Sequence, residues 1–335
     1  ASVRPPSRYH FQRQAMPSAC ESGPSRRSLL KASVSLGIGA TAAWGLATEF
    51  DAAGDTADIV YAYTRPEPGT QRVRERTKSV PADWHATVTQ AFELQERLQA
   101  AAPSSFLASF AIPGSFDDPQ ASLSVTATDR SIETVLDDVT EELAVDLTVL
   151  DDVPRTPWND QVTRDAYEVA SIELPDPPSG VACMAGSKTA TLGPALYDLK
   201  DGTRYFTTAN HLFGAKGTKA TAHKGTPLLI RHGDETRELG RVVRGYPKTD
   251  VVQVAPANGS YPASTIAEAV PGTVIGQYTK LGLADLMARS EPLHKFGTIS
   301  RHTTGQIKGV DGVTCFAGKG CKRGQLKWGS EQTMT

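Results

Sequence analysis

The sequence predicts a mainly β protein in which a barrel follows a small α+β domain. From Val181 to Thr335, short runs of β-branched and aromatic residues are separated by Gly, Pro and Asn turns, the pattern of an antiparallel barrel. Residues 51–150 instead combine helical periodicity with alternating strands. Residues 151–180 are rich in proline, which is typical of a linker. A chain of 335 residues with 39% hydrophobic content has room for both domains and for a leader at 1–50.

The α+β domain is predicted from the order of its elements. A helix opens at Pro81 with apolar residues on one face, and Ser131 is a candidate N-cap for a second helix. Residues 51–75 are polar and predict no regular structure. The expected elements are a helix at 81–101, strands at 106–112 and 121–128, a helix at 131–143 and a strand at 145–150.

The leader contains a candidate export signal. Ser25-Arg26-Arg27-Ser28-Leu29-Leu30-Lys31 matches the twin-arginine motif, which a receptor reads. The apolar run behind it, 32–47, is shorter than the ~20 residues that span a bilayer. We therefore expect export by the twin-arginine pathway to the cell surface or beyond, with no stable membrane span. The alternative is a chance Arg-Arg pair ahead of an ordinary helix.

The four cysteines predict one disulfide. Cys315 and Cys321 bracket a Gly-rich turn between strand-like flanks, so a bond across a hairpin is expected, with two free thiols as the alternative. Closing so short a loop would stabilise the fold by about 2 kcal/mol on the entropic model. Cys20 belongs to the leader. Cys183 has no assigned partner: it pairs with a residue outside this sequence or stays buried and reduced.

The charge distribution argues against a nucleic-acid platform. The net charge of −2 combines an acidic segment at 51–180 with a basic one at 181–335. The basic residues are scattered among turns, without the interleaved aromatic residues that stack on bases. We expect no nucleic-acid partner.

Two residues at strand ends suggest acid–base chemistry. An aromatic and β-branched run, Tyr205–Thr208, predicts a strand that delivers His211 to its end. Asp250 opens another apolar strand, Val251–Val254. Histidine can both take and give a proton near neutrality, and a carboxylate bonded to one ring nitrogen fixes its tautomer. Each residue alone is more often structural, but the pair in these contexts favours catalysis.

At these residues the chain resembles the chymotrypsin/trypsin-like serine peptidases. In that family the histidine follows a Thr/Ala-rich strand end and the aspartate opens an Asp-aliphatic strand. A third match, Pro292–Ile307, resembles the strand–turn–strand of the family's second barrel. The resemblance covers about Val181 to Thr335 and implies a double β-barrel. His294 and His302, within the third match, are expected to be strand or turn residues; a zinc site with the nearby cysteines is a weak alternative without ligand spacing.

The family's nucleophile motif is missing from this sequence. The serine normally lies in a Gly-Asp-Ser-Gly loop whose amides also form the oxyanion hole. No such run occurs here, and Ser330 lacks both the preceding acid and the following glycines. Because the loop normally follows a strand pair like 313–328, we expect the serine beyond Thr335 and the second barrel to be incomplete. A relative without the serine, kept as a binding module, is the alternative.

Together these inferences predict an exported serine endopeptidase acting on protein or peptide substrates. The resemblance implies that His211 is the general base and then acid, that Asp250 orients it, and that neither a metal nor an organic cofactor is needed. This chain should itself be inactive without the nucleophile. The domain at 51–150 is expected to be a pro-domain in contact with the peptidase domain, or else an unrelated accessory domain. The main alternative function is a catalytically dead double barrel that binds protein or polymer at the cell surface. A metal-dependent hydrolase would need further ligands, and no His-x-x-x-His or His-Glu-x-x-His spacing occurs.

Overall fold

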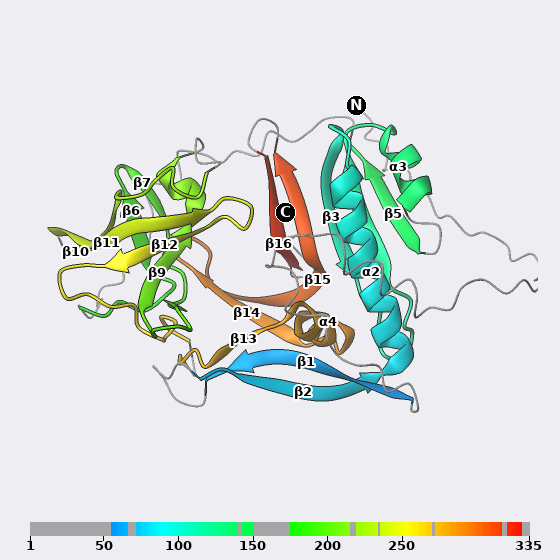
Figure 1. The fold of residues 1–335 in the computed structure, drawn as a ribbon, viewed down its shortest axis with the longest axis horizontal. Helices are drawn as coiled ribbons and strands as arrows, with labels where there is room; N and C mark the ends of the chain where they lie inside the picture. The colour runs from blue at the N-terminus through cyan, green and yellow to red at the C-terminus, as the bar shows by residue number, and fades with distance from the viewer. Residues whose placement is uncertain are drawn as a thin grey trace, which may run out of the picture.

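The described part of the chain contains most of both predicted domains (Figure 1). The computed structural model describes residues 55–65, 72–139, 143–150, 175–214, 219–233, 235–269, 272–316 and 320–329. The twin-arginine match and most of the predicted linker lie outside these residues. Within them, no helix combines the length and the hydrophobicity needed to cross a membrane.

The structure is mainly β, as the sequence predicts. The N-terminal elements are β1 (Thr56–Thr64), β2 (Arg74–Pro81), α2 (Ala82–Ala101), β3 (Phe106–Ile112), β4 (Ser122–Ala127), α3 (Ile132–Val139) and β5 (Ala144–Val149). The next elements are β6 (Ala182–Ala185), β7 (Lys188–Thr191), β8 (Leu196–Tyr197), β9 (Arg204–Ala209), η2 (Asn210–Phe213), β10 (Pro227–His232), β11 (Glu235–Tyr246) and β12 (Val251–Pro256). The last are β13 (Gly276–Tyr278), α4 (Lys280–Ala288), β14 (Pro292–Gly297), β15 (Arg301–Phe316) and β16 (Gly320–Gly329).

Residues 175–269 form a sheet that curls around its own core, shown in green and yellow in Figure 1. Its seven strands lie in the order β7-β6-β10-β11-β12-β9-β8. Alternate residues face inward, so that Leu228 and Ile230 of β10 meet Val252 and Val254 of β12 in the interior. All the buried members of this core come from residues 181–267, so we call this region the first barrel.

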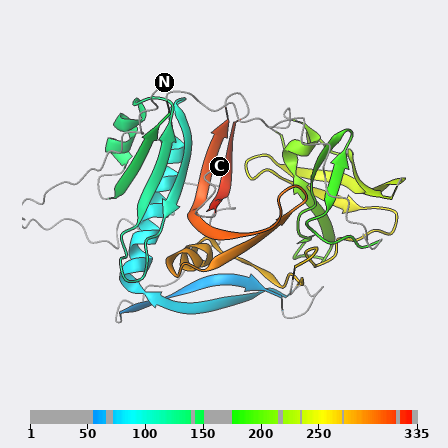
Figure 2. The same cartoon turned by 180° about the vertical axis from the view of Figure 1, so that it is seen from behind.

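The later strands share a sheet with the N-terminal domain. The order is β14-β15-β3-β4-β5. In addition, β16 pairs antiparallel with the later part of β15, from Gln306 to Phe316. The two parts of the sheet meet where β15 pairs with β3. This pairing is antiparallel, with Val310 opposite Ala111 and Thr314 opposite Ala108. Figures 1 and 2 both show the orange and red hairpin beside the cyan strand β3. The domain boundary at 151–180 remains a prediction. Strand β3, which precedes it in the sequence, is hydrogen-bonded to β15, which follows it.

A single core joins these two parts of the chain. Trp84 of α2 and Leu123 of β4 pack in the same cluster as Ala284 of α4 and Val310 of β15. The face of α2 predicted from the sequence is the face that is buried. We use the name shared core for the buried residues of this cluster, which lie between Ile59 and Val313.

One expectation about this part of the molecule is wrong, and one element was not expected. Residues 51–75 are not all irregular, because β1 pairs with both β2 and β13 in a third sheet. The charged strand β2 is an edge of this sheet, and its side chains mostly face solvent. The helix α4 was not expected either. It begins after Thr279, whose hydroxyl accepts a hydrogen bond from the Gly282 amide at 2.9 Å.

The arrangement confirms the predicted fold class. It is mainly β: the first barrel is a curled sheet, and β14, β15 and β16 belong to a sheet completed by β3, β4 and β5 of the preceding α+β region. The first barrel holds both predicted site residues, at the ends of two adjacent strands.

Candidate active site

The register of two strands brings the predicted site residues together. β9 and β12 are antiparallel, and Ala209 at the end of one is opposite Val251 at the start of the other. The residues just outside this pair must therefore be neighbours. The Asn210 amide donates to the Asp250 carbonyl at 2.9 Å, and the short helix η2 then turns His211 back over the aspartate.

His211 and Asp250 form a two-point contact. The ring atom Nδ1 lies 2.6 Å from Asp250 Oδ2, and the His211 amide donates to Oδ1 at 3.0 Å. An ionised carboxylate can only accept, so Nδ1 carries the proton and Nε2 carries the lone pair. The His211 side chain is 41% exposed and that of Asp250 is 19% exposed. The arrangement provides a fixed carboxylate behind an imidazole whose other nitrogen can take up a proton.

Asp250 is held in its ionised form. Burial alone would raise the pKa of this carboxyl group, but the hydrogen bond and charge of His211, with those of Lys322, outweigh it and lower the pKa. The residue also has a left-handed backbone, with a φ of 57°. Aspartate tolerates this conformation better than most residues, which suits the position at the end of a tight turn.

The strand that carries His211 is anchored by buried polar contacts. The Thr208 hydroxyl donates to the Thr191 carbonyl at 2.8 Å, and the thiol of Cys183 lies 3.3 Å from Thr208 Oγ1. Burial raises the pKa of Cys183 to about 12, against a smaller opposing effect of the Thr208 hydrogen bond. Cys183 is therefore a neutral, buried thiol, one of the two states expected for it.

Glycine is required beside the residue that precedes His211. A Cβ on Gly245 would lie 2.5 Å from the side-chain oxygen of Asn210, closer than real contacts allow. Asn210 is itself buried, at 3% exposure. A side chain at Gly245 would therefore force the buried Asn210 amide group to move.

The structure adds a residue that sequence reasoning missed. Lys322 of β16 donates to Asp250 Oδ1 at 3.2 Å and to the Pro247 carbonyl at 2.9 Å. Its side chain is only 17% exposed. The residue is 72 positions from Asp250 in sequence, and no motif or spacing marks it, so only its position next to Cys321 could have drawn attention.

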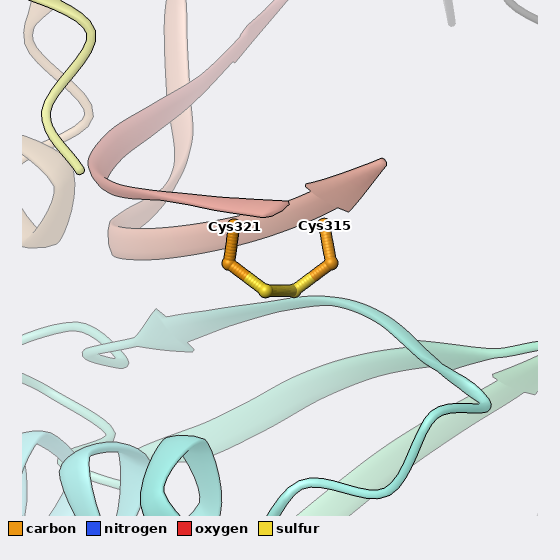
Figure 3. The surroundings of a disulfide bond; sticks show 2 residues. All are labelled: Cys315 and Cys321. Atoms are coloured by element: carbon orange, nitrogen blue, oxygen red, sulfur yellow. A yellow bond between two sulfur atoms is a disulfide. The ribbon is translucent and has the colours of Figure 1, made fainter. Parts of the chain in front are cut away.

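The predicted disulfide is confirmed. Cys315 and Cys321 are bonded across the β15–β16 hairpin, as Figure 3 shows, with strand β3 beneath them. The two cysteines are directly opposite each other in the register, and the next pair along is Thr314 with Lys322. The covalent link therefore lies one residue from the lysine that contacts Asp250.

The described residues provide no set of ligands for the zinc site considered as an alternative. Among the described residues, no group of three or more His, Cys, Asp or Glu could hold a metal ion. His294 and His302 stack on neighbouring strands, with ring nitrogens 3.1 Å apart and the Thr304 hydroxyl at 3.1 Å from His294. They are exposed strand residues, as the sequence suggested.

Comparisons with known proteins give only distant structural likenesses. No protein-family model matches the chain, and no curated protein does. A glutamic acid-specific serine protease that uses a histidine triad in substrate binding is 20% identical; the match covers 45% of this chain and 71% of that one, with a TM-score of 0.31. Thermobifida fusca protease A and a Nocardiopsis protease are each 15% identical; these matches cover 45% of this chain and 68% and 69% of theirs, also with TM-scores of 0.31. Likenesses at this level decide nothing about function, which has to be inferred from the site.

Proposed function

We propose that this chain is part of an exported serine endopeptidase that hydrolyses peptide bonds with a Ser-His-Asp triad. The observation that carries the proposal is the 2.6 Å contact between His211 Nδ1 and Asp250 Oδ2, at the ends of paired strands of a β-barrel. A partly buried carboxylate behind a half-exposed imidazole is the arrangement that activates a hydroxyl nucleophile.

In the proposed reaction, His211 Nε2 takes the proton from a serine hydroxyl as its oxygen attacks the peptide carbonyl carbon. The imidazolium that forms is stabilised by the Asp250 carboxylate, which remains ionised. His211 then gives the proton to the leaving amine as the C–N bond breaks. A water molecule releases the acyl group by the same steps in reverse. The serine is the one predicted to follow Thr335.

The N-terminal domain is proposed to be a pro-domain. Support comes from the sheet that β3 and β15 share and from the shared core, in which Trp84 and Leu123 pack with Val310. A segment that supplies much of the core for the later strands is suited to assist their folding. Export is supported by the Cys315–Cys321 disulfide, which is typical of oxidising compartments, together with the twin-arginine match.

The test is a longer form of the protein, continued through the predicted serine and assayed on a mixture of unlabelled protein substrates and fluorogenic peptides. The full-length form should hydrolyse them, and His211→Ala should lower turnover on the order of a million-fold. The matched control is His232→Ala, an exposed histidine at the end of β10, which should leave turnover unchanged. Hydrolysis that survives His211→Ala would refute the assignment. A folded longer form that hydrolyses no peptide bond would favour the binding module.

A further inference from the structure

The tip of the β15–β16 hairpin lies against the turn that presents Asp250. The Arg323 amide donates to the Lys248 carbonyl at 2.6 Å, and the Lys322 ammonium donates to the Pro247 carbonyl at 2.9 Å. These contacts connect two different sheets. β16 pairs with β15 in the sheet shared with the N-terminal domain, whereas the turn belongs to the first barrel. The hairpin therefore fixes the turn from outside the first barrel.

The Lys322 side chain continues past this turn to the carboxylate. Asp250 Oδ1 accepts from both the His211 amide and the Lys322 ammonium, while Oδ2 faces the His211 ring. The carboxylate is thus held by donors from two elements, η2 and β16. Because Lys322 and Asp250 are 17% and 19% exposed, their attraction is screened less than that of an ordinary surface ion pair.

We propose that Lys322 is a positioning residue for the His211–Asp250 pair: its ammonium fixes the Asp250 carboxylate against the histidine. The effect of Lys322 on catalysis rests on the proposed function. The contact between Lys322 and Asp250 can be tested in a protein without activity. The Cys315–Cys321 disulfide holds the two strands of the hairpin together one residue away, and β3 supports the other side of β15. Lys322 therefore links the site to the sheet that the N-terminal domain helps to form.

Charge balance predicts the effect on catalysis. The charged groups that face Asp250 are the imidazole of His211 from η2 and the ammonium of Lys322 from β16. Without the ammonium, the carboxylate would attract a proton more strongly and would also stabilise the imidazolium more strongly. A base that is protonated cannot take a proton from the nucleophile, so the acid limb of the pH–rate profile should move to higher pH.

The first experiment follows the Asp250 carboxyl carbon of ¹³C-labelled protein by NMR during an acid titration. In the chain described here, Lys322→Met should raise the titration midpoint of Asp250 by at least about half a pH unit. Lys322→Gln, which keeps a hydrogen-bond donor without the charge, should give a similar rise and replaces the methionine variant if that one does not fold. Lys322→Arg should restore a midpoint near that of the original protein. Lys308→Met is the matched control, since this exposed lysine of β15 donates only to Gln306 at 3.5 Å among the hydrogen bonds found, and it should change nothing.

The second experiment uses the longer form that carries the nucleophile. Lys322→Met should lower kcat by about tenfold to a hundredfold with KM little changed, and the acid limb should move to higher pH. Lys322→Arg should recover most of the loss. An Asp250 midpoint that is the same in Lys322→Met, Lys322→Gln and the original protein would overturn the proposal. If the midpoint moves but the longer form hydrolyses nothing, the role of Lys322 at the carboxylate stands and the peptidase assignment fails.

Discussion

The first barrel and the strands that follow it acquire their cores in different ways. The first barrel buries Leu228, Ile230 and Val254 against each other, and all the buried residues of its core come from one continuous stretch of sequence. The later strands bury Val310 and Val313 in the same cluster as residues of α2 and β4, elements that precede the first barrel in the sequence. One region is therefore complete in itself, while the other depends on the N-terminal domain.

Because of this difference, the two proposed catalytic residues and the residue proposed to position them come from different regions. His211 and Asp250 both come from the first barrel, and strand register alone makes them neighbours. Lys322 comes from the dependent region and reaches the pair across the boundary between the two. We therefore expect variants in the first barrel to affect the reaction itself, and variants in the shared core to affect folding and the reach of Lys322.

The largest expected effect compares two carboxylates with ion-pair partners, one in each region. In the longer form, Asp250→Asn should lower kcat on the order of ten-thousand-fold, about 5 kcal/mol in activation free energy, because the amide would favour the wrong histidine tautomer. Asp285, at 2% exposure, instead pairs with Lys78 at 2.7 Å and Arg289 at 3.0 Å. Asp285→Asn should cost about 2 kcal/mol of unfolding free energy and leave kcat of the folded protein unchanged.

Steady-state kinetics and urea unfolding of the two variants measure these quantities. An Asp250→Asn variant with full turnover would mean that another acid orients His211. A large loss of kcat in folded Asp285→Asn would remove the distinction between the two regions.

A pair of core truncations tests the same distinction through stability. Leu123→Ala in β4 and Leu228→Ala in β10 each remove a fully buried side chain and should cost about 2–5 kcal/mol. Hydrogen exchange should show that the two variants lose protection in different regions of the molecule. Leu123→Ala should speed exchange in β15 and leave the first barrel protected, whereas Leu228→Ala should do the opposite. Equal loss of protection in both regions for either variant would show that they unfold as one unit.

The sequence predicted the fold best where local pattern and burial agree. β3 has the predicted bounds, β4 alternates buried residues as expected, and α2 buries the predicted face. The pattern failed at β1, which lies in a stretch expected to be irregular, and at α4, where an apolar helix of nine residues offers little contrast between its faces. Both elements have a partner far away in sequence: β1 pairs with β13, and Thr279 at the start of α4 donates to the Val60 carbonyl.

The candidate site divides in a similar way. His211 and Asp250 could be picked from the sequence because each lies next to a recognisable strand, and the chain resembles a family there. Lys322 could not, since its role depends on the approach of the hairpin to the turn at Pro247, which no local pattern encodes. The pairing of β3 with β15 was equally hidden, because proline-rich sequence between two domains predicts separation.

A smaller effect is expected from opening the hairpin. Replacing Cys315 and Cys321 together with serine should lower the unfolding free energy by about 2 kcal/mol. The change should raise the exchange rates of β16 amides, including that of Lys322, while the strands β10 and β12 stay protected. Differential hydrogen exchange with and without the disulfide measures this directly. Faster exchange in β10 would mean that the first barrel depends on the hairpin after all.

The smallest effect is a pH dependence that differs between the regions. Burial lowers the pKa of His85 in α2, so the folded state favours the neutral ring and the unfolded state takes up more protons. The stability of the shared core should therefore fall as the pH drops below the unfolded value of 6.5. The lowered pKa of Asp250 acts later, since its stabilising effect is lost only as the pH falls below 3.8. Exchange measured at pH 7 and pH 5 should show weakening in β3 and β15 before β12, and His85→Gln should reduce that difference.

The hydrogen bond between His211 and Asp250 is the central claim, and proton NMR of ¹⁵N-histidine-labelled protein tests it most directly. At pH 7 the Nδ1–H of His211 should give a downfield, slowly exchanging signal, because the proton lies between the ring and an ionised carboxylate. The signal should vanish in Asp250→Ala and persist in Lys308→Met. A folded protein without this signal, or one that keeps it unchanged in Asp250→Ala, would contradict the account.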